Sequence, residues 1–454
     1  MQPECQPRRR LSASVAIYML LLISPLLGAQ VERISLASDG SEANADSYQP
    51  ALSDDGSMLA FRSNAGNLVA GDTNGQSDIF VRDLGAGTTR RVSLQLDGSQ
   101  SVSYNRFPGI SGDGTRVVFA GAATTVVTVT AVVDLDAEPL SVTHLLPRDA
   151  GGNPAPALRA RLQPALSGNG RFVTFHSPHT FADAHPASVR PLADDDNQAH
   201  DVFVLDIETQ PTPALERVSR DSPGDQGRGD SISGSLSDTG RWVAFDSLAD
   251  DLVPGDVNEK SDVFIRDRDT GTTELVSADS NGEFGNDESR NAHLAGNGNF
   301  VAFRSKASNL VAADDNARWD IFVRDRSAGT TERVSVSSTG AEGNNNSMEA
   351  SISDDGRFVA FRSLASNLVA GDDNDRADIF VHDRTSGATA LVSRTPNEAA
   401  NGSSANPAIS GDGNWIAFES DATNLVAGDT NGARDLFRVP NPLAAALGSA
   451  QGEN

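Results

Sequence analysis

The sequence predicts an all-β fold made of one four-stranded unit repeated seven times. A repeated apolar segment of the form FVAFRS places its second Phe every 56 to 58 residues, with one interval of 70. Each unit has four short apolar runs separated by turn residues, and no segment shows sustained helical periodicity. Such units close into a ring, which predicts a seven-bladed β-propeller with four antiparallel strands per blade. The recurring residues are Phe61, Phe119, Phe175, Phe245, Phe303, Phe361 and Phe418.

The sixth unit shows where each strand is expected. Asp355-Gly356 favours a tight turn after the first strand. The next run is apolar at four successive positions, as in a strand covered on both faces. We therefore expect strands at 350–353, 357–363, 378–383 and 390–393, with a long loop at 364–377.

The two ends of the chain predict how the ring closes. The last copy stops after its third strand, at 435–439. The first copy is preceded by a lone fourth-strand sequence, ERIS at 32–35, which matches ERVS at 332–335. We expect strand 32–35 to complete the last blade, because this join removes an exposed sheet edge. Residues 30–439 then form one propeller domain.

Composition limits the partners that the protein can have. The 454 residues carry a formal net charge of −26, and the only lysines are Lys260 and Lys306. This balance argues against nucleic acid or an anionic membrane surface as a partner. It favours cations or basic partners.

Residues 1–29 are predicted to be a secretory signal peptide. An arginine triplet at 8–10 precedes a mostly apolar stretch at 11–27, and small residues for cleavage follow at 28–29. An uncleaved membrane anchor is the alternative, although the apolar stretch is short and interrupted. The single cysteine, Cys5, lies in this segment, so the mature chain uses no disulfide. We expect a periplasmic or secreted protein with no membrane span after cleavage, and a disordered tail at 440–454.

The unit resembles the TolB-type, WD40-like propeller repeat. SDDGRFVAF at 353–361 is similar to the S-P-D-G turn and apolar strand of that family, and DIFVHD at 378–383 is similar to its D-I-Y-V strand. The resemblance covers residues 31–439, and it departs from the family in having Asp or Gly where the turn usually has Pro. It implies a periplasmic or secreted propeller that binds another envelope or extracellular protein, or a glycan.

Six of the seven units carry a D-x-N-x-x-x-D pattern between the second and third strands. Carboxylate and amide oxygens at alternate positions suit calcium, although the fifth position is never acidic and the bidentate Glu of a calcium loop is absent. The alternative is structural, because Asp and Asn side chains also bond to loop amides in turns. The candidate ligands are Asp72, Asn74, Asp78, Asp195, Asn197, Asp201, Asp256, Asn258, Asp262, Asp314, Asn316, Asp320, Asp372, Asn374, Asp378, Asp429, Asn431 and Asp435.

Units two and three depart from the repeat. Unit two lacks the D-x-N loop, and unit three has an insertion near 184–192. Unit three also holds His176, His179, His185 and His200, with Asp183, Asp194 and Asp195 nearby in the sequence. A transition-metal site is one interpretation, but the spacing matches no zinc pattern. An exposed polar loop is the other.

The motifs predict a non-catalytic binding or scaffold protein rather than an enzyme, with calcium in its loops as one interpretation and turn chemistry as the other. No G-x-S-x-G, H-E-x-x-H or phosphate-binding loop occurs. Connections between blades, such as 97–107, 285–292 and 340–349, should share one face with the D-x-N loops and form an acidic surface suited to a cation, a basic peptide or a glycan. One alternative is a hydrolase or lyase acting on extracellular polysaccharide, with its site in the irregular units two and three. A purely structural envelope protein is another alternative.

Overall fold

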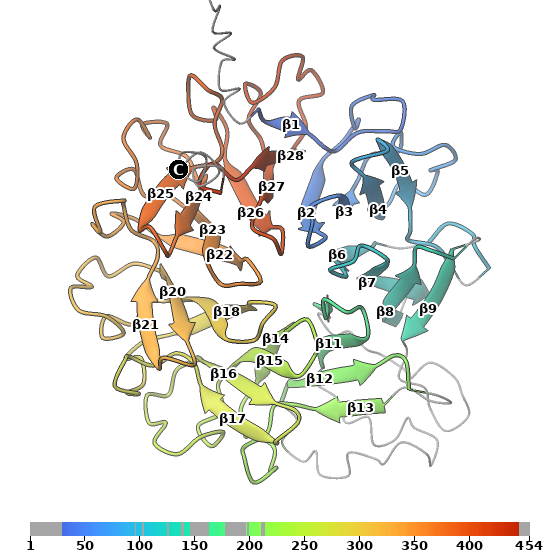
Figure 1. The fold of residues 1–454 in the computed structure, drawn as a ribbon. Helices are drawn as coiled ribbons and strands as arrows, with labels where there is room; N and C mark the ends of the chain where they lie inside the picture. The colour runs from blue at the N-terminus through green and yellow to red at the C-terminus, as the bar shows by residue number, and fades with distance from the viewer. Residues whose placement is uncertain are drawn as a thin grey trace, which may run out of the picture.

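The computed structural model is a ring of seven four-stranded antiparallel sheets around a central axis (Figure 1). The structure describes residues 30–444 except 96, 102–103, 125–126, 138–139, 146–162, 178–196, 198 and 210–213. Every named element in these residues is a strand. The predicted seven-bladed, all-β propeller is confirmed. Within the described residues, no helix has the length and apolar character needed to cross a membrane.

The blades are numbered one to seven from the N-terminus, and the first strand of each lies nearest the axis (Figure 1). Blade one contains β2 (Ser47–Leu52), β3 (Met58–Ser63), β4 (Asp78–Asp83) and β5 (Thr88–Arg91). Blade two contains β6 (Arg106–Ile110), β7 (Arg116–Thr124), β8 (Val127–Asp134) and β9 (Ser141–Leu145). Blade three contains β10 (Ala165–Leu166), β11 (Phe172–Ser177), β12 (Asp201–Asp206) and β13 (Ala214–Arg217).

The remaining blades follow the same order. Blade four contains β14 (Ser231–Leu236), β15 (Trp242–Ser247), β16 (Asp262–Asp267) and β17 (Thr272–Leu275). Blade five contains β18 (Ser289–Leu294), β19 (Phe300–Ser305), β20 (Asp320–Asp325) and β21 (Thr330–Arg333). Blade six contains β22 (Ser347–Ile352), β23 (Phe358–Ser363), β24 (Asp378–Asp383) and β25 (Ala388–Leu391). Blade seven contains β26 (Ser404–Ile409), β27 (Trp415–Ser420), β28 (Asp435–Pro440) and β1 (Glu32–Arg33).

A pair of phenylalanines holds the middle of most blades. Phe61 of β3 faces Phe80 of β4 in register, and their ring centroids lie 5.7 Å apart. Equivalent pairs in blades three to seven have centroids 5.8–6.1 Å apart. Blade two has Phe119 opposite Ala131 instead. Burying each such ring stabilises the fold by roughly 1.5–3 kcal/mol, which explains why the second and third strands are apolar nearly throughout.

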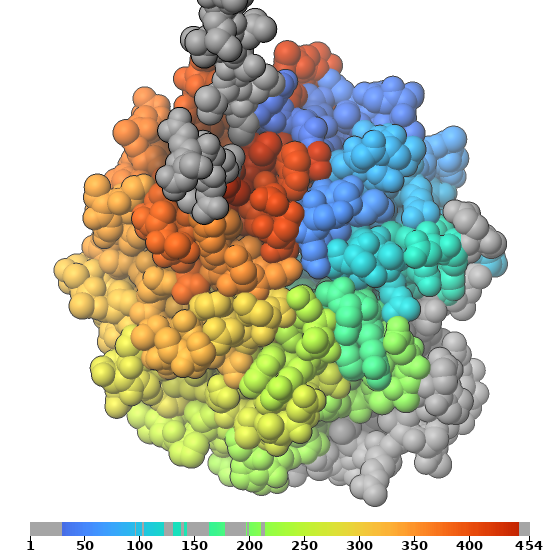
Figure 2. All heavy atoms as spheres, viewed as in Figure 1, coloured from blue at the N-terminus to red at the C-terminus, as the bar shows by residue number. Residues whose placement is uncertain are grey.

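The ring closes as predicted. β1 pairs antiparallel with β28, with Glu32 opposite Arg438. The N–H of Ile34 continues the pairing by donating to the carbonyl of Leu436 at 2.8 Å. Gly56 of blade one lies against Trp415 of blade seven, where a Cβ would come within 2.6 Å of the indole. Figure 2 shows the first and last described segments, in blue and red, side by side.

Several predicted boundaries shift in the structure. β22 begins at Ser347 rather than 350, because the chain bulges at Glu349 and then resumes pairing. β25 ends at Leu391, where Val392 and Ser393 turn back to bond the carbonyl of Ile379. β28 includes Pro440, and Asn441 is buried, so the ordered propeller continues past the predicted start of the tail. The leader at 1–29, the insertion at 184–192 and the tail after 444 lie outside the described residues.

Candidate functional site

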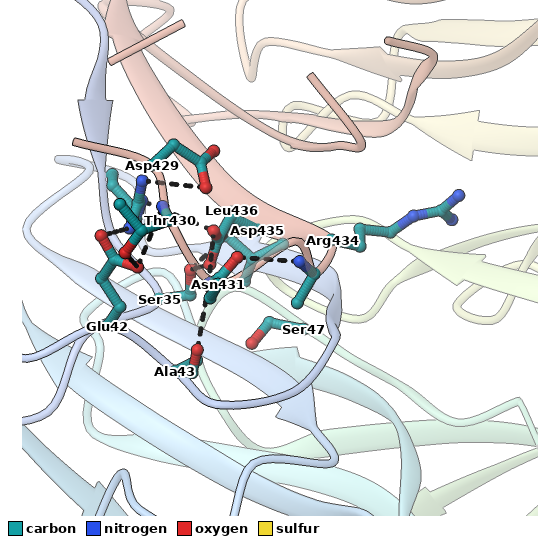
Figure 3. A network of polar contacts seen from close by, with 12 residues as sticks. Ser35, Glu42, Ala43, Ser47, Asp429, Thr430, Asn431, Arg434, Asp435 and Leu436 are labelled. Carbon is teal, nitrogen blue, oxygen red and sulfur yellow. Dashed lines mark hydrogen bonds and ion pairs between the residues drawn. The ribbon is translucent and has the colours of Figure 1, made fainter. Parts of the chain in front are cut away.

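In the D-x-N-x-x-x-D loops, the asparagine side chain bonds both the last Asp of the loop and the connection that leads to the next blade. We call this pair of contacts the asparagine clip. In blade seven, Asn431 Nδ2 donates to Asp435 Oδ2 at 2.9 Å and to the carbonyl of Ala43 at 3.0 Å (Figure 3). Asn431 Oδ1 accepts from the N–H of Ala433 at 2.8 Å. The buried Asp435 accepts from Ser35 Oγ at 2.6 Å. These contacts also show that D-x-N loops and blade connections share one face, as predicted.

The same clip recurs around the ring. Asn74, Asn258, Asn316 and Asn374 each bond the last Asp of their loop and a carbonyl of the following connection. In blade three, Asn197 bonds the carbonyl of Gly227, and Asp201 accepts from Ser219, whereas Asp195 lies outside the described residues. The turn chemistry anticipated for these side chains is therefore present in all six loops.

Arginines from the fourth strands lie against the acids of four loops. In blade seven, Arg33 reaches Glu42 at 2.7 Å, Asp429 at 3.4 Å and Asp435 at 3.5 Å. Arg91, Arg217 and Arg333 contact loop acids in blades one, three and five. A guanidinium thus supplies positive charge where calcium was predicted, and the sequence analysis missed this role. No group of three or more His, Cys, Asp or Glu side chains in the described part of the chain is arranged to hold a metal ion.

The histidine cluster of blade three is brought together only in part. The rings of His176 and His200 have centroids 5.8 Å apart. Burial, with the neighbouring His200, lowers the pKa of His176 to about 4, so this imidazole is neutral at neutral pH. The other predicted members, His179, His185, Asp183, Asp194 and Asp195, lie outside the described residues.

An axial channel is lined by the first strands of all seven blades. Its upper part, about 370 Å³, lies towards the D-x-N loops, and its lower part is about 340 Å³. A β-bulge with a left-handed residue shapes the upper wall in six blades. These bulge residues are Gln49, Phe107, Ser233, Asn291, Glu349 and Asn406. The upper wall therefore mixes amide, hydroxyl and carboxylate groups with proline, alanine and phenylalanine side chains.

Side chains of the preceding blade hold the bulges in place. The N–H of Gln49 donates to Glu419 at 2.9 Å, and that of Asn406 donates to Glu349 at 2.9 Å. The N–H of Asn291 donates to Asp246 at 2.8 Å. These acids remove the cost of an unpaired amide at the bulge and fix the channel wall.

The floor of the channel is closed by the turns between first and second strands. Seven backbone hydrogen bonds of 2.8–3.2 Å link each turn to the next and complete a ring, for example from the Asp54 N–H to the Gly112 carbonyl. Each of these turns has four residues, and its second residue is Asp in three blades and Gly in four. The acids are Asp54, Asp238 and Asp354, and the glycines are Gly112, Gly168, Gly296 and Gly411.

The three floor carboxylates converge on the axis. A Cβ on Gly411 would lie 2.1 Å from Asp354 Oδ2 and 2.8 Å from Asp54 Oδ1, so these oxygens are no farther apart than the two distances combined. A Cβ on Gly296 would similarly lie 2.4 Å from Asp238 Oδ2 and 2.6 Å from Asp354 Oδ1. The glycines are needed because the neighbouring carboxylates occupy the space of a side chain.

The floor is electrostatically uncompensated. Burial and the charge of Asp238 raise the pKa of Asp54 to about 6, and burial with Asp238 and Asp54 raises that of Asp354 to about 7. None of the described residues that line the channel is Arg or Lys. His293 lines both parts, and it is exposed to the channel. Near pH 7 Asp354 is about half protonated, whereas Asp54 stays mostly ionised, so the floor keeps a negative charge that no described Arg or Lys of the channel lining balances.

The sequence contained a signal for this floor. The TolB-type repeat usually has Pro at the second position of this turn. In this chain the same position carries the three acids and the four glycines. What no single unit could show is that acids in blades one, four and six meet at one point.

Comparison with known proteins identifies the architecture. No protein-family model matches the chain, and neither does any curated protein sequence. The oligogalacturonate lyase from Vibrio parahaemolyticus is 12% identical, with a TM-score of 0.51, over 91% of this chain and 97% of that one. The β-propeller domain of the Trilobed protease from Pyrococcus furiosus is 13% identical, with a TM-score of 0.50, over 87% and 95%.

The chain is a β-propeller. At these identities the likeness shows the fold alone. TolB from Acinetobacter baumannii is also among the similar structures, at 13% identity and a TM-score of 0.40 over 80% of this chain and 76% of TolB. The fold is the one that the TolB-type resemblance implied.

Proposed function

We propose that this chain is a non-catalytic binding propeller of the periplasm or the extracellular space, and that its axial channel receives a cationic group of a partner. The observation that carries the proposal is the convergence of Asp54, Asp238 and Asp354 without a described Arg or Lys in the channel. An ammonium or guanidinium group at this floor would form charge-assisted hydrogen bonds and relieve the repulsion between the acids.

The upper channel and the sequence support the same partner class. The amide and hydroxyl groups of Gln49, Ser233, Asn291 and Asn406 can bond a peptide backbone or a sugar on the way to the floor. The predicted leader supports export, and the formal net charge of −26 favours a basic partner. The proposed partner is a basic segment of an envelope or extracellular protein.

A polysaccharide hydrolase or lyase has less support. Its predicted place is in blades two and three, where the residues that would carry it, Asp194, Asp195, His179 and His185, lie outside the described residues. An anionic polysaccharide would also be repelled by the carboxylates of the channel floor. This alternative makes a distinct prediction and is an outcome of the test below.

The test uses four probes on the mature chain. All four probes carry fluorescein. They are a peptide rich in Lys and Arg, an Asp- and Glu-rich peptide of equal length, a neutral oligosaccharide and oligogalacturonate. We expect the basic peptide alone to raise fluorescence anisotropy, with binding that weakens as salt is added. Binding of oligogalacturonate, or release of shortened products from either sugar, would instead support the enzyme.

A further inference from the structure

We infer that blade six holds one calcium site, in which Asp372 and Asp375 bind the ion inside a small polar cavity. The inference goes beyond the proposed function, because this site lies in a D-x-N loop and not in the axial channel. It also narrows the calcium predicted for six loops to one of them.

The first step is that Asp372 lacks the partners of its equivalents. Its side chain is 8% exposed, and it forms no hydrogen bond or ion pair with any described residue. In contrast, Asp72 of blade one accepts from Gln100 at 2.7 Å and lies 3.5 Å from Arg91. The carboxylate oxygens of Asp372 stay in contact with the cavity, so they are open either to water or to a cation.

The second step is that blade six has lost the arginine that faces the loop in blade five but has kept the aspartates of the loop itself. In blade five, Arg333 contacts both Asp314, at 3.2 Å, and Glu342 of the next connection, at 2.8 Å. Blade six has Leu391 and Ala399 at these two positions. Blade four has also lost its arginine, but there the bulkier Phe284 stands at the connection position, and Asp256 accepts from the N–H of Asn258.

The third step is that room and ligands are present beside Asp372. A cavity of about 140 Å³ is lined by Asp372 and Asp375 together with Asn344, Asn345, Leu364, Ser366 and Arg376. The amide oxygens of Asn344 and Asn345 and the hydroxyl oxygen of Ser366 already accept hydrogen bonds. The two carboxylates would therefore be the main protein ligands, and waters would complete the six to eight oxygens that calcium takes. Asp373 and Asp378 add further negative charge next to Asp372, against the single exposed Arg376 at the cavity.

The flexible geometry favours calcium over magnesium. Magnesium demands near-octahedral geometry and short metal–oxygen distances, whereas calcium accepts irregular sets of loop oxygens. The absence of a third acid from the cavity lining is consistent with the finding that no group of three acidic or histidine side chains in the described residues is arranged for a metal.

The test is calorimetric titration of the mature chain with CaCl₂ at pH 7.5, followed by thermal melts with calcium and with chelator. We expect one equivalent of calcium to bind and to raise the melting midpoint. Asp372→Asn should weaken binding at least tenfold. The matched control, Asp72→Asn in blade one, should leave calcium binding unchanged.

A second variant protects the test against misfolding. Leu391→Arg combined with Ala399→Glu installs in blade six the arginine and acid of blade five. We expect this variant to fold, to lose calcium binding and to melt at the same temperature with calcium and chelator. The inference is overturned if the wild-type chain binds no calcium, or if binding survives both Asp372→Asn and the double substitution.

Discussion

The residue after the loop asparagine adopts a left-handed backbone wherever the structure describes it. Gly75 and Gly432 take it with φ of 64° and 62°, whereas Glu259, Ala317 and Asp375 take it with φ of 54–55°. A left-handed backbone costs an L-residue roughly 1–2 kcal/mol. The asparagine clip is thus strong enough to hold three blades in a conformation that their own residues disfavour.

Replacing Ala317 with glycine should stabilise the protein. Glycine removes the left-handed penalty but loses more conformational entropy on folding, so we expect a net gain of about 0.5–1 kcal/mol in the free energy of unfolding. Chemical denaturation measures this difference. The matched substitution Gly432→Ala in blade seven should lower the free energy of unfolding by a similar amount. Equal stability of the wild type and both variants would contradict the proposed backbone strain at this position.

At the residue scale, the sequence predicted which side chains form the clip but not what lies against it. The loop residues were found because each unit repeats them at fixed spacing. Arg33 was missed because it and Asp435 are about four hundred positions apart and meet only when the ring closes. Arg91, Arg217 and Arg333 lie in the same units as the acids that they contact, so the repeat itself carried a signal for them. Leu275 and Leu391 show why this matters, since the same motif has a different electrostatic setting in blades four and six.

At the scale of elements, β1 was the most predictable and the bulges the least. The match between 32–35 and the other fourth strands identified β1 directly. The bulge residues have no side-chain type in common: Phe107 is aromatic, Glu349 is acidic, and the others are amides or serine. Their role is set by backbone geometry instead. A pattern of residue types therefore could not locate them, and β22 was predicted to start too late.

Removing residues 30–36 should open the ring. β28 would lose its outer partner, and the carboxylate of Asp435 would lose Ser35 and Arg33. We expect a lower melting midpoint and concentration-dependent aggregation through the exposed edge of β28. A synthetic peptide of residues 30–38 added in trans should restore part of the midpoint. An unchanged midpoint without the peptide would contradict the role of β1 in closure.

At the scale of the whole molecule, buried acids set the pH dependence of stability. Burial raises the pKa of Asp54, Asp246, Asp262, Asp314 and Asp372 to about 6 and that of Asp354 to about 7. These groups bind protons more readily in the folded than in the unfolded chain, where the pKa is about 3.9. Folding is therefore favoured as pH falls from about 7 towards 5.

Other groups limit this gain at lower pH. His176, with its pKa lowered to about 4 by burial, opposes folding as pH falls below about 6.5. Asp206, Asp267 and Asp383, with pKa lowered to about 2 in part by arginine contacts, contribute stability that is lost below about pH 4. Melts in chelator should give a higher midpoint near pH 5 than near pH 8. A midpoint that rises steadily with pH would contradict the six raised pKa values.

The floor of the channel is a property of the closed ring. Asp54, Asp238 and Asp354 come from blades one, four and six, and each belongs to an ordinary turn of its own unit. Because these acids meet only at the axis of the closed ring, the floor was not predicted from the sequence. The acidic surface that was predicted is the D-x-N loop face, at the other end of the channel.

The most direct measurement of the central claim is the affinity of the basic peptide for a chain carrying Asp54→Asn, Asp238→Asn and Asp354→Asn. Asparagine keeps the shape of the floor and removes its charge. We expect at least a tenfold loss of affinity at low salt. A control chain with three exposed acids neutralised, Asp136→Asn, Asp225→Asn and Glu283→Gln, changes the formal charge equally and should bind like the wild type. Equal affinity of the floor variant and the control would contradict a cation-binding channel.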